Sequence, residues 1–170
     1  NEHKKQRKND TMLEDAISGD GLLKAEILEE LYSEAMELSS SIVEYLQSNK
    51  RESMKHLEVG SMGFYTLECN RMTTGVMQAM SWCLMQKGVQ SGEMTVEEAS
   101  NKQNRLSNNE LFDEPVGCDT AIFPELFADY SMRVRVLYGK IVRVDRLLYE
   151  AGVLEENPVH NMLDKLEQNT

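Results

Sequence analysis

The side chains best suited to chemistry in this chain are three histidines and three cysteines, and their spacing forms no catalytic or metal-binding motif. His3, His56 and His160 lie in three separate segments, and none belongs to an HxxxH pair, with which a helix presents two ligands to zinc. Glu52 and His56 share a helix face at positions i and i+4, but two groups do not complete a site. We therefore predict no metal, no cofactor and no catalytic residue.

The cysteines, Cys69, Cys83 and Cys118, are odd in number and contain no CxxC pair. Cys69 and Cys83 are separated by about 21 Å on one continuous helix, which excludes a disulfide within it. Glycine-rich phosphate loops and the GxSxG nucleophile motif are also absent from the sequence. These observations predict a protein of a reducing cytoplasm that is not an enzyme.

Composition restricts the classes of partner. The 170 residues carry a net charge of −11, which argues against nucleic-acid binding. No apolar run is long enough to cross a bilayer, so we expect no membrane partner. The length allows one domain with a core, or a dimer built from long helices.

Long amphipathic helices must position these side chains. Between residues 127 and 148 the apolar residues alternate at spacings of three and four, as in a coiled-coil seam. Its members are Phe127, Tyr130, Val134, Leu137, Ile141, Val144 and Leu148. An earlier stripe repeats the pattern at Leu28, Leu31, Ala35, Leu38, Ile42 and Tyr45. Both stripes must be buried, which predicts a bundle of helices.

Turn and capping signals divide the chain further. Residues 1–21 are polar and are predicted to be disordered, and the first helix runs from about residue 20 to residue 47. A second helix is expected over residues 51–89, followed by a capping box at Thr95 and Glu98 that starts a short helix. A loop over residues 107–122 precedes Pro124, where the third long helix begins.

We therefore predict an all-α fold: an antiparallel bundle of three long helices with a short extra helix over residues 22–152, forming a homodimer. The dimer is expected because the second helix is apolar nearly all round. Residues 153–170 are predicted to be a flexible tail, either disordered or a short amphipathic docking segment.

Two groups of residues are candidates for partner binding. The last long helix is slightly basic, and the bland interpretation is charge complementarity between helices. The alternative is a partner-binding face of Arg133, Arg135, Lys140, Arg143 and Arg146. In the tail, four apolar residues at helical spacing suit a partner's groove: Val159, Met162, Leu163 and Leu166. The eleven methionines are either core filler or an adaptable contact surface.

Residues 66–99, TLECNRMTTGVMQAMSWCLMQKGVQSGEMTVEEA, carry a family resemblance. The matching features are RMTT at residues 71–74, MQAMSW at residues 77–82 and the QxxVxxGEM pattern at residues 86–94. Flanking matches are AMELSSSIVEYL at residues 35–46 and LYGKIVRVDRLLYE at residues 137–150. In these features the chain resembles the bacterial regulator of CtrA degradation (RcdA) family, also known as a domain of unknown function (DUF1465).

The resemblance implies a dimeric three-helix bundle that acts as an adaptor without enzymatic activity. Such an adaptor delivers cell-cycle regulators, including the response regulator CtrA, to the ATP-dependent protease ClpXP. It works with a receiver-domain protein that primes the protease and with a cyclic-di-GMP effector protein. We predict this function, in the cytoplasm or concentrated at a cell pole. The alternatives are a structural coiled-coil scaffold and a small-molecule-binding or catalytic bundle.

Overall fold

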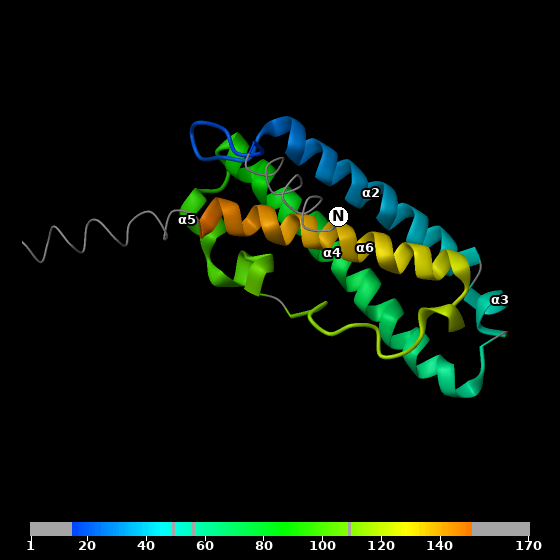
Figure 1. Cartoon of the computed structure of the whole chain (residues 1–170). Helices are drawn as coiled ribbons and strands as arrows, with labels where there is room; N and C mark the ends of the chain where they lie inside the picture. Colours follow the sequence, from blue (N-terminus) through cyan, green and yellow to red (C-terminus); the bar gives the residue numbers. More distant parts are fainter. Residues whose placement is uncertain (1–14, 49, 56, 109, 151–170) are drawn as a thin grey trace, which may run out of the picture.

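The computed structural model describes residues 15–48, 50–55, 57–108 and 110–150. Three long helices, α2 (Ala25–Ser48), α4 (Met62–Ser91) and α6 (Glu125–Tyr149), pack on one another around one shared core (Figure 1). The short helices are α3 (Lys50–Lys55) and α5 (Val96–Ser100). The 3₁₀ turns are η1 (Val59–Ser61), η2 (Lys102–Asn104), η3 (Leu106–Asn108) and η4 (Thr120–Ile122). The predicted all-α fold is therefore confirmed for the described residues, where one isolated bridge, Ile17 to Leu23, is the sole β pairing.

The two predicted apolar stripes form the centre of the core. All six members of the first stripe are buried on α2. On α6, five of the seven seam residues are buried, and Tyr130 and Leu148 pack against the core while partly exposed. Tyr45 of the first stripe meets Tyr130 and Phe127 of the second at centroid distances of 5.8 and 6.3 Å, and so joins the two stripes. Heptad spacing thus correctly predicted eleven buried residues on α2 and α6.

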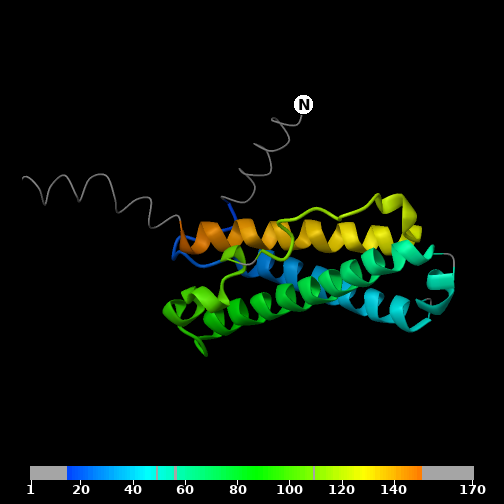
Figure 2. The ribbon, with the colours of Figure 1, turned by 90° about the horizontal axis from the view of Figure 1, so that it is seen from below.

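The direction of the helices differs from the antiparallel arrangement that we predicted. Side chains of α4 meet residues of α6 in ascending order, from Glu68 with Ser131 to Gln86 with Tyr149, so α4 and α6 run parallel. Helix α2 runs opposite to both, because Lys87 at the end of α4 pairs with Glu29 at the start of α2. The connection over residues 92–124 is long enough to return along the whole bundle, whereas short loops impose antiparallel neighbours (Figure 2).

The predicted second helix is broken into two. Helix α3 ends at Lys55, and α4 begins at Met62 after the turn η1. Glu58 has an extended backbone, and Val59 and Gly60 are exposed. Continuing the helix through this segment would place a β-branched residue and a glycine in a helix interior, where both are unfavourable. Residues 49 and 56 lie outside the described residues.

Several element boundaries also shift from their predicted positions. Helix α4 continues past Gly88 and ends in a Schellman motif: Gly92 has a φ of 77°, and the Glu93 amide donates to the Gly88 carbonyl at 2.9 Å. The predicted capping box of Thr95 and Glu98 is present, although α5 is only one turn long. Pro124 caps α6, and that helix ends at Tyr149.

The N-terminal boundary lies earlier than predicted. Residues 15–21 fall within the described part of the chain and form a turn in which the Lys24 amide donates to the Ala16 carbonyl at 2.8 Å. Ala16 and Leu23 are buried in the core, so this turn covers one end of the bundle, and α2 starts only at Ala25. The predicted disorder of residues 1–14 falls outside the described residues, as does the tail over residues 153–170.

Candidate functional site

The basic residues of α6 do not form one open face. Lys140 pairs with Glu34 at 3.1 Å, and Arg133 lies 4.0 Å from Glu37, so α2 partly neutralises both cations. This arrangement agrees with the interpretation of complementary helix faces for these two residues. Arg143 and Arg146 are exposed, and neither has an ion pair within the described part of the chain.

Arg135 points into the groove between α4 and α6, where it binds Glu68. Its Nε donates to one Glu68 carboxylate oxygen at 3.1 Å and its Nη2 donates to the other at 2.9 Å, the bidentate geometry of a strong charge-assisted pair. Ser131 donates a further hydrogen bond to the same carboxylate. Arg71 lies 4.0 Å from the Glu68 carboxylate and is a secondary partner. The position of Arg135 therefore suits internal structure better than contact with a partner protein.

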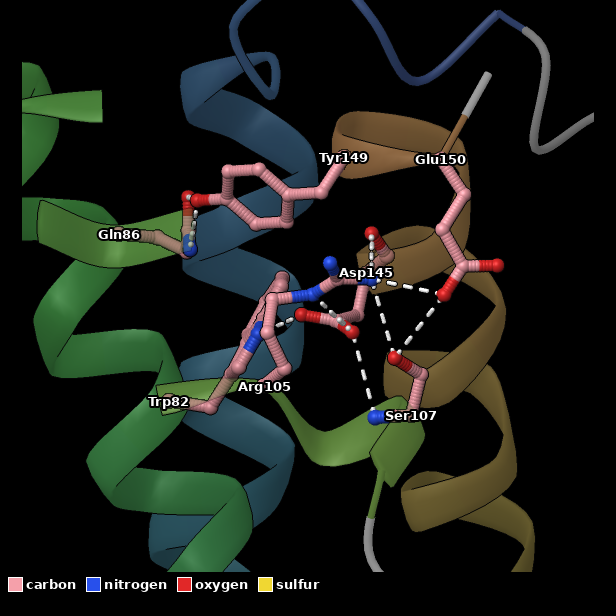
Figure 3. Close-up of polar contacts among 7 residues, drawn as sticks. All are labelled: Trp82, Gln86, Arg105, Ser107, Asp145, Tyr149 and Glu150. Carbon is pink, nitrogen blue, oxygen red and sulfur yellow. Dashed lines mark hydrogen bonds and ion pairs between the residues drawn. The ribbon is translucent and has the colours of Figure 1, made fainter. Parts of the chain in front are cut away.

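A second polar cluster, around Asp145, fastens the strap, which we define as residues 101–123, to α6. Trp82 of α4 donates to one oxygen of Asp145 at 2.9 Å, and Arg105 donates to the other at 2.8 Å (Figure 3). The Ser107 amide donates to that second oxygen at 3.2 Å. The side chain of Asp145 is fully buried and that of Arg105 is 9% exposed. A buried carboxylate with three donors is fully satisfied and fixes the geometry of its neighbours.

The Arg105 guanidinium extends the cluster beyond Asp145. Its Nη2 donates to the half-exposed Glu150 carboxylate at 3.0 Å, and the same guanidinium lies 4.8 Å above the Tyr149 ring (Figure 3). Gln86 donates to the Tyr149 hydroxyl at 2.9 Å, which links α4 to the last turn of α6. The strap is thus held at one end by a network that includes both parallel helices.

Phe112 anchors the middle of the strap. A Cβ added at Gly75 would lie 2.6 Å from two ring carbons of Phe112, so the absence of a side chain in α4 creates the space for this ring. The Arg135 guanidinium stacks 4.7 Å from the ring centre, and Tyr138 meets the ring edge-on at 5.0 Å. An open hollow of about 630 Å³ remains between the strap and α6. Its lining mixes both signs of charge: Lys102, Ser107, Glu110, Phe112, Asp113, Arg135, Tyr138, Gly139, Val142 and Arg146.

Three titratable groups with raised pKa values, Cys83, Cys118 and Tyr138, are poorly suited to nucleophilic chemistry. Burial raises the pKa of the Cys83 thiol to about 12, and the pKa of Cys118 is also raised, by desolvation and then by the nearby Glu68 and Asp119 carboxylates. Thiolate nucleophiles need a lowered pKa. Burial likewise raises the pKa of Tyr138 to about 12.

The described residues contain neither a metal-binding cluster nor a membrane-spanning helix. No three His, Cys, Asp or Glu side chains within that part of the chain are grouped to hold a metal ion. Among the same residues, no helix has the length and apolarity needed to span a bilayer. His3, His56 and His160 lie outside the described residues, as do the tail candidates Val159, Met162, Leu163 and Leu166.

Sequence reasoning missed both polar clusters, although a signal for them exists. On α6, Ser131 and Asp145 occur at helical spacing with the buried Phe127, Val134 and Tyr138. On α4, Glu68 and Gln86 fall in the same way among the buried apolar residues of that helix. A polar residue at an apolar position of a helical stripe indicates a buried group that needs partners. Which residues supply those partners depends on the parallel arrangement of α4 and α6.

These features define a small all-α protein whose buried carboxylates, Glu68 and Asp145, are held by hydrogen bonds within the fold. The chain belongs to the family described as protein of unknown function (DUF1465), whose model matches residues 19–169. It is also similar to the crystal structure of RcdA from Caulobacter crescentus CB15, with a TM-score of 0.60 and 27% sequence identity. That similarity covers 74% of this chain and 93% of the other, and it confirms the RcdA resemblance of the sequence. A comparison with curated protein sequences found no match.

Proposed function

We propose that this protein is a non-enzymatic adaptor that promotes the regulated degradation of cell-cycle regulators, such as the response regulator CtrA, by the protease ClpXP. The observation that carries the proposal is the similarity to RcdA, which covers nearly the whole of that protein's chain. The family match over residues 19–169 supports it, because most of this sequence conforms to one family pattern.

The chemistry of the described residues is compatible with this role. The raised pKa values of Cys83 and Cys118 disfavour thiolate catalysis, and the Glu68 and Asp145 carboxylates are engaged in structural hydrogen bonds. An adaptor needs no reactive group, since tethering cargo to a protease raises its effective concentration and can add roughly 10²–10⁴-fold in avidity. The exposed Arg143 and Arg146 and the apolar residues of the tail are our candidates for the tethering contacts.

The proposed partners are the cargo proteins, a receiver-domain protein that primes ClpXP and a cyclic-di-GMP effector protein. We propose that the protein acts as a homodimer in the cytoplasm, concentrated at a cell pole. A dimer suits this function because two copies present two cargo sites to one protease, which increases avidity without a new contact.

A reconstituted degradation assay tests the proposal. ClpXP, the priming protein, the effector protein and CtrA are combined with and without the full chain, and loss of CtrA is followed by gel electrophoresis. The full chain should accelerate degradation. Replacing Val159, Met162, Leu163 and Leu166 with serine should slow degradation again, because these side chains are proposed to dock in a partner. The matched control replaces Met132 with serine, an equally apolar but isolated surface residue of α6.

A degradation rate that is the same with and without the full chain would contradict the adaptor proposal. It would favour the structural scaffold, which binds partners without changing their turnover. If the tail variant is as active as the wild type, the contact must instead involve Arg143 and Arg146. Replacing both arginines with glutamine then becomes the decisive variant, with Lys140→Gln, already paired on α2, as its control.

A further inference from the structure

The outward face of α4 carries a second stripe with coiled-coil spacing. Its positions alternate at four and three residues along nearly the whole helix: Gly63, Leu67, Asn70, Thr74, Met77, Ser81, Leu84 and Gly88. The first seven are exposed, and Met77, which is 68% exposed, is the most open large apolar residue among them. The buried residues of α4, from Tyr65 to Gln86, lie on the opposite side of the helix. The stripe therefore has no packing partner within the described part of the chain.

This stripe also lacks charge in a protein that is otherwise strongly charged. Between Met62 and Gln86 the charged residues are Glu68 and Arg71, and both side chains are turned inward. A solvated helix face normally carries charged residues, as α2 does at Glu30, Glu37 and Glu44. Two copies of a chain with a net charge of −11 repel each other unless their contact surface is free of charge. An uncharged stripe at heptad spacing meets that requirement.

We propose that the α4 stripe docks a second copy of this chain, with the two α4 helices antiparallel about a two-fold axis level with residues 75 and 76. This inference rests on the dimer of the proposed function and specifies its surface, direction and register. In an antiparallel coiled coil each a position faces a d position of the other helix. The two-fold places Leu67 of one copy opposite Leu84 of the other, and Thr74 opposite Met77.

The same register matches the remaining positions of the stripe. Asn70 of one copy faces Ser81 of the other, so polar groups meet polar groups and fix the register. Gly63 faces Gly88, which lets the helix ends approach closely. Along the contact, each leucine layer thus lies between two layers of smaller side chains, which close packing can accommodate. An isologous contact of this kind closes as a dimer and does not propagate.

The exposed apolar residues of α6 do not offer an equivalent surface. On α6 the exposed Leu126, Met132 and Val136 do not continue at heptad spacing, and the exposed Asp129 and Arg143 interrupt them. Met132 is 60% exposed, similar to Met77, and therefore provides a matched control in the same side-chain type and secondary structure.

Sedimentation equilibrium of the full chain at micromolar concentration tests the surface. The wild type and Met132→Glu should sediment as dimers. Met77→Glu should raise the dimer dissociation constant by about 100-fold or more, because two glutamates meet in a desolvated contact. Leu84→Glu provides a second disruption of the same stripe, and circular dichroism verifies that each variant keeps its helicity.

Spin labels test the direction. In a chain with Cys69 and Cys118 replaced by serine, labels are placed on cysteine at position 67 or at position 77; the buried Cys83 does not accept one. The antiparallel register places the two 77 positions nearly level, and separates the two 67 positions by about 25 Å along the helices. Electron–electron double resonance measures both distances.

A wild type that sediments near 19.4 kDa at all concentrations would overturn the proposal. So would a Met77→Glu variant that remains as dimeric as Met132→Glu. Short distances at both label positions would indicate parallel helices and reject the register. None of these measurements involves the protease, so the proposed dimer surface can be rejected without rejecting the proposed adaptor function, and the reverse.

Discussion

The two faces of α4 solve opposite problems. The face toward α6 buries the Glu68 carboxylate and the Trp82 indole, and each receives its partners from α6. The outward face has no charge over some six turns, although water would readily solvate one there. The inner face therefore carries a charge that needs buried partners, whereas the outward face, where water would stabilise a charge, carries none. This difference agrees with our proposal that the inner face determines how the chain folds and the outer face determines how two copies associate.

The largest loss of stability is expected from replacing Asp145 of α6, which accepts a hydrogen bond from Trp82 on the inner face of α4. Asp145→Asn keeps the shape of the side chain but leaves Arg105, only 9% exposed, without its main counter-charge. Removing one member of a buried pair lowers the free energy of unfolding by about 3–5 kcal/mol. Urea unfolding followed by circular dichroism measures the loss.

The matched control for this variant is Glu150→Gln. Glu150 contacts the same guanidinium, but its carboxylate is half-exposed, so its removal should change the free energy of unfolding by about 1 kcal/mol or less. An Asp145→Asn variant no less stable than Glu150→Gln would show that the buried pair does not hold the strap.

Gly75→Ala tests the seat of the strap on α4. The new methyl group would lie 2.6 Å from the Phe112 ring, so the ring must move, at a cost of about 1–3 kcal/mol. The better helix propensity of alanine offsets about 1 kcal/mol of this. We expect a net loss of about 0–2 kcal/mol in unfolding free energy.

Two further variants sharpen the Gly75 prediction. Phe112→Leu in the Gly75→Ala background should restore part of the loss, because it removes the ring from the clash. Gly139→Ala, where the nearest atom is the Arg143 Nη1 at 4.0 Å, should stabilise the protein by about 0.5–1 kcal/mol. A stabilising Gly75→Ala would mean that the strap does not rest against α4.

The smallest expected effect is at Lys140, where α2 and α6 meet at the surface. Its ion pair with Glu34 is about two-fifths exposed on the lysine side, so Lys140→Met should lower the unfolding free energy by less than about 1 kcal/mol. The urea midpoints of the wild type and of Lys140→Met are compared at low salt and at high salt, which screens a surface ion pair. A loss as large as that of Asp145→Asn would contradict the distinction between surface and buried pairs.

Local patterns predicted much of this fold. The stripes on α2 and α6 were identified correctly because heptad spacing depends only on which residues face one partner. The capping box at Thr95 and Glu98 was also correct, because its hydrogen bonds join residues three apart in the sequence. Both patterns depend only on residues that are close together in the sequence.

What sequence reasoning missed depends on contacts between distant segments. The parallel direction of α6 follows from the path of the strap, which rests on Arg105 with Asp145 and on Phe112 beside Gly75. Those pairs are 37 or more residues apart, and spacing alone does not connect them. The same reason explains Arg135, which the sequence presents as one of five basic residues and the structure places on Glu68.

The most direct test of the account is urea unfolding of the full chain at two protein concentrations, about 1 µM and about 100 µM. A protein stabilised by association unfolds at a higher midpoint when it is more concentrated. We predict that the wild type and Asp145→Asn both shift with concentration, with Asp145→Asn lower throughout, and that Met77→Glu does not shift. A wild-type midpoint independent of concentration, or a Met77→Glu variant whose midpoint still shifts, would contradict the proposal that the outward face of α4 forms the dimer while the inner face stabilises the fold.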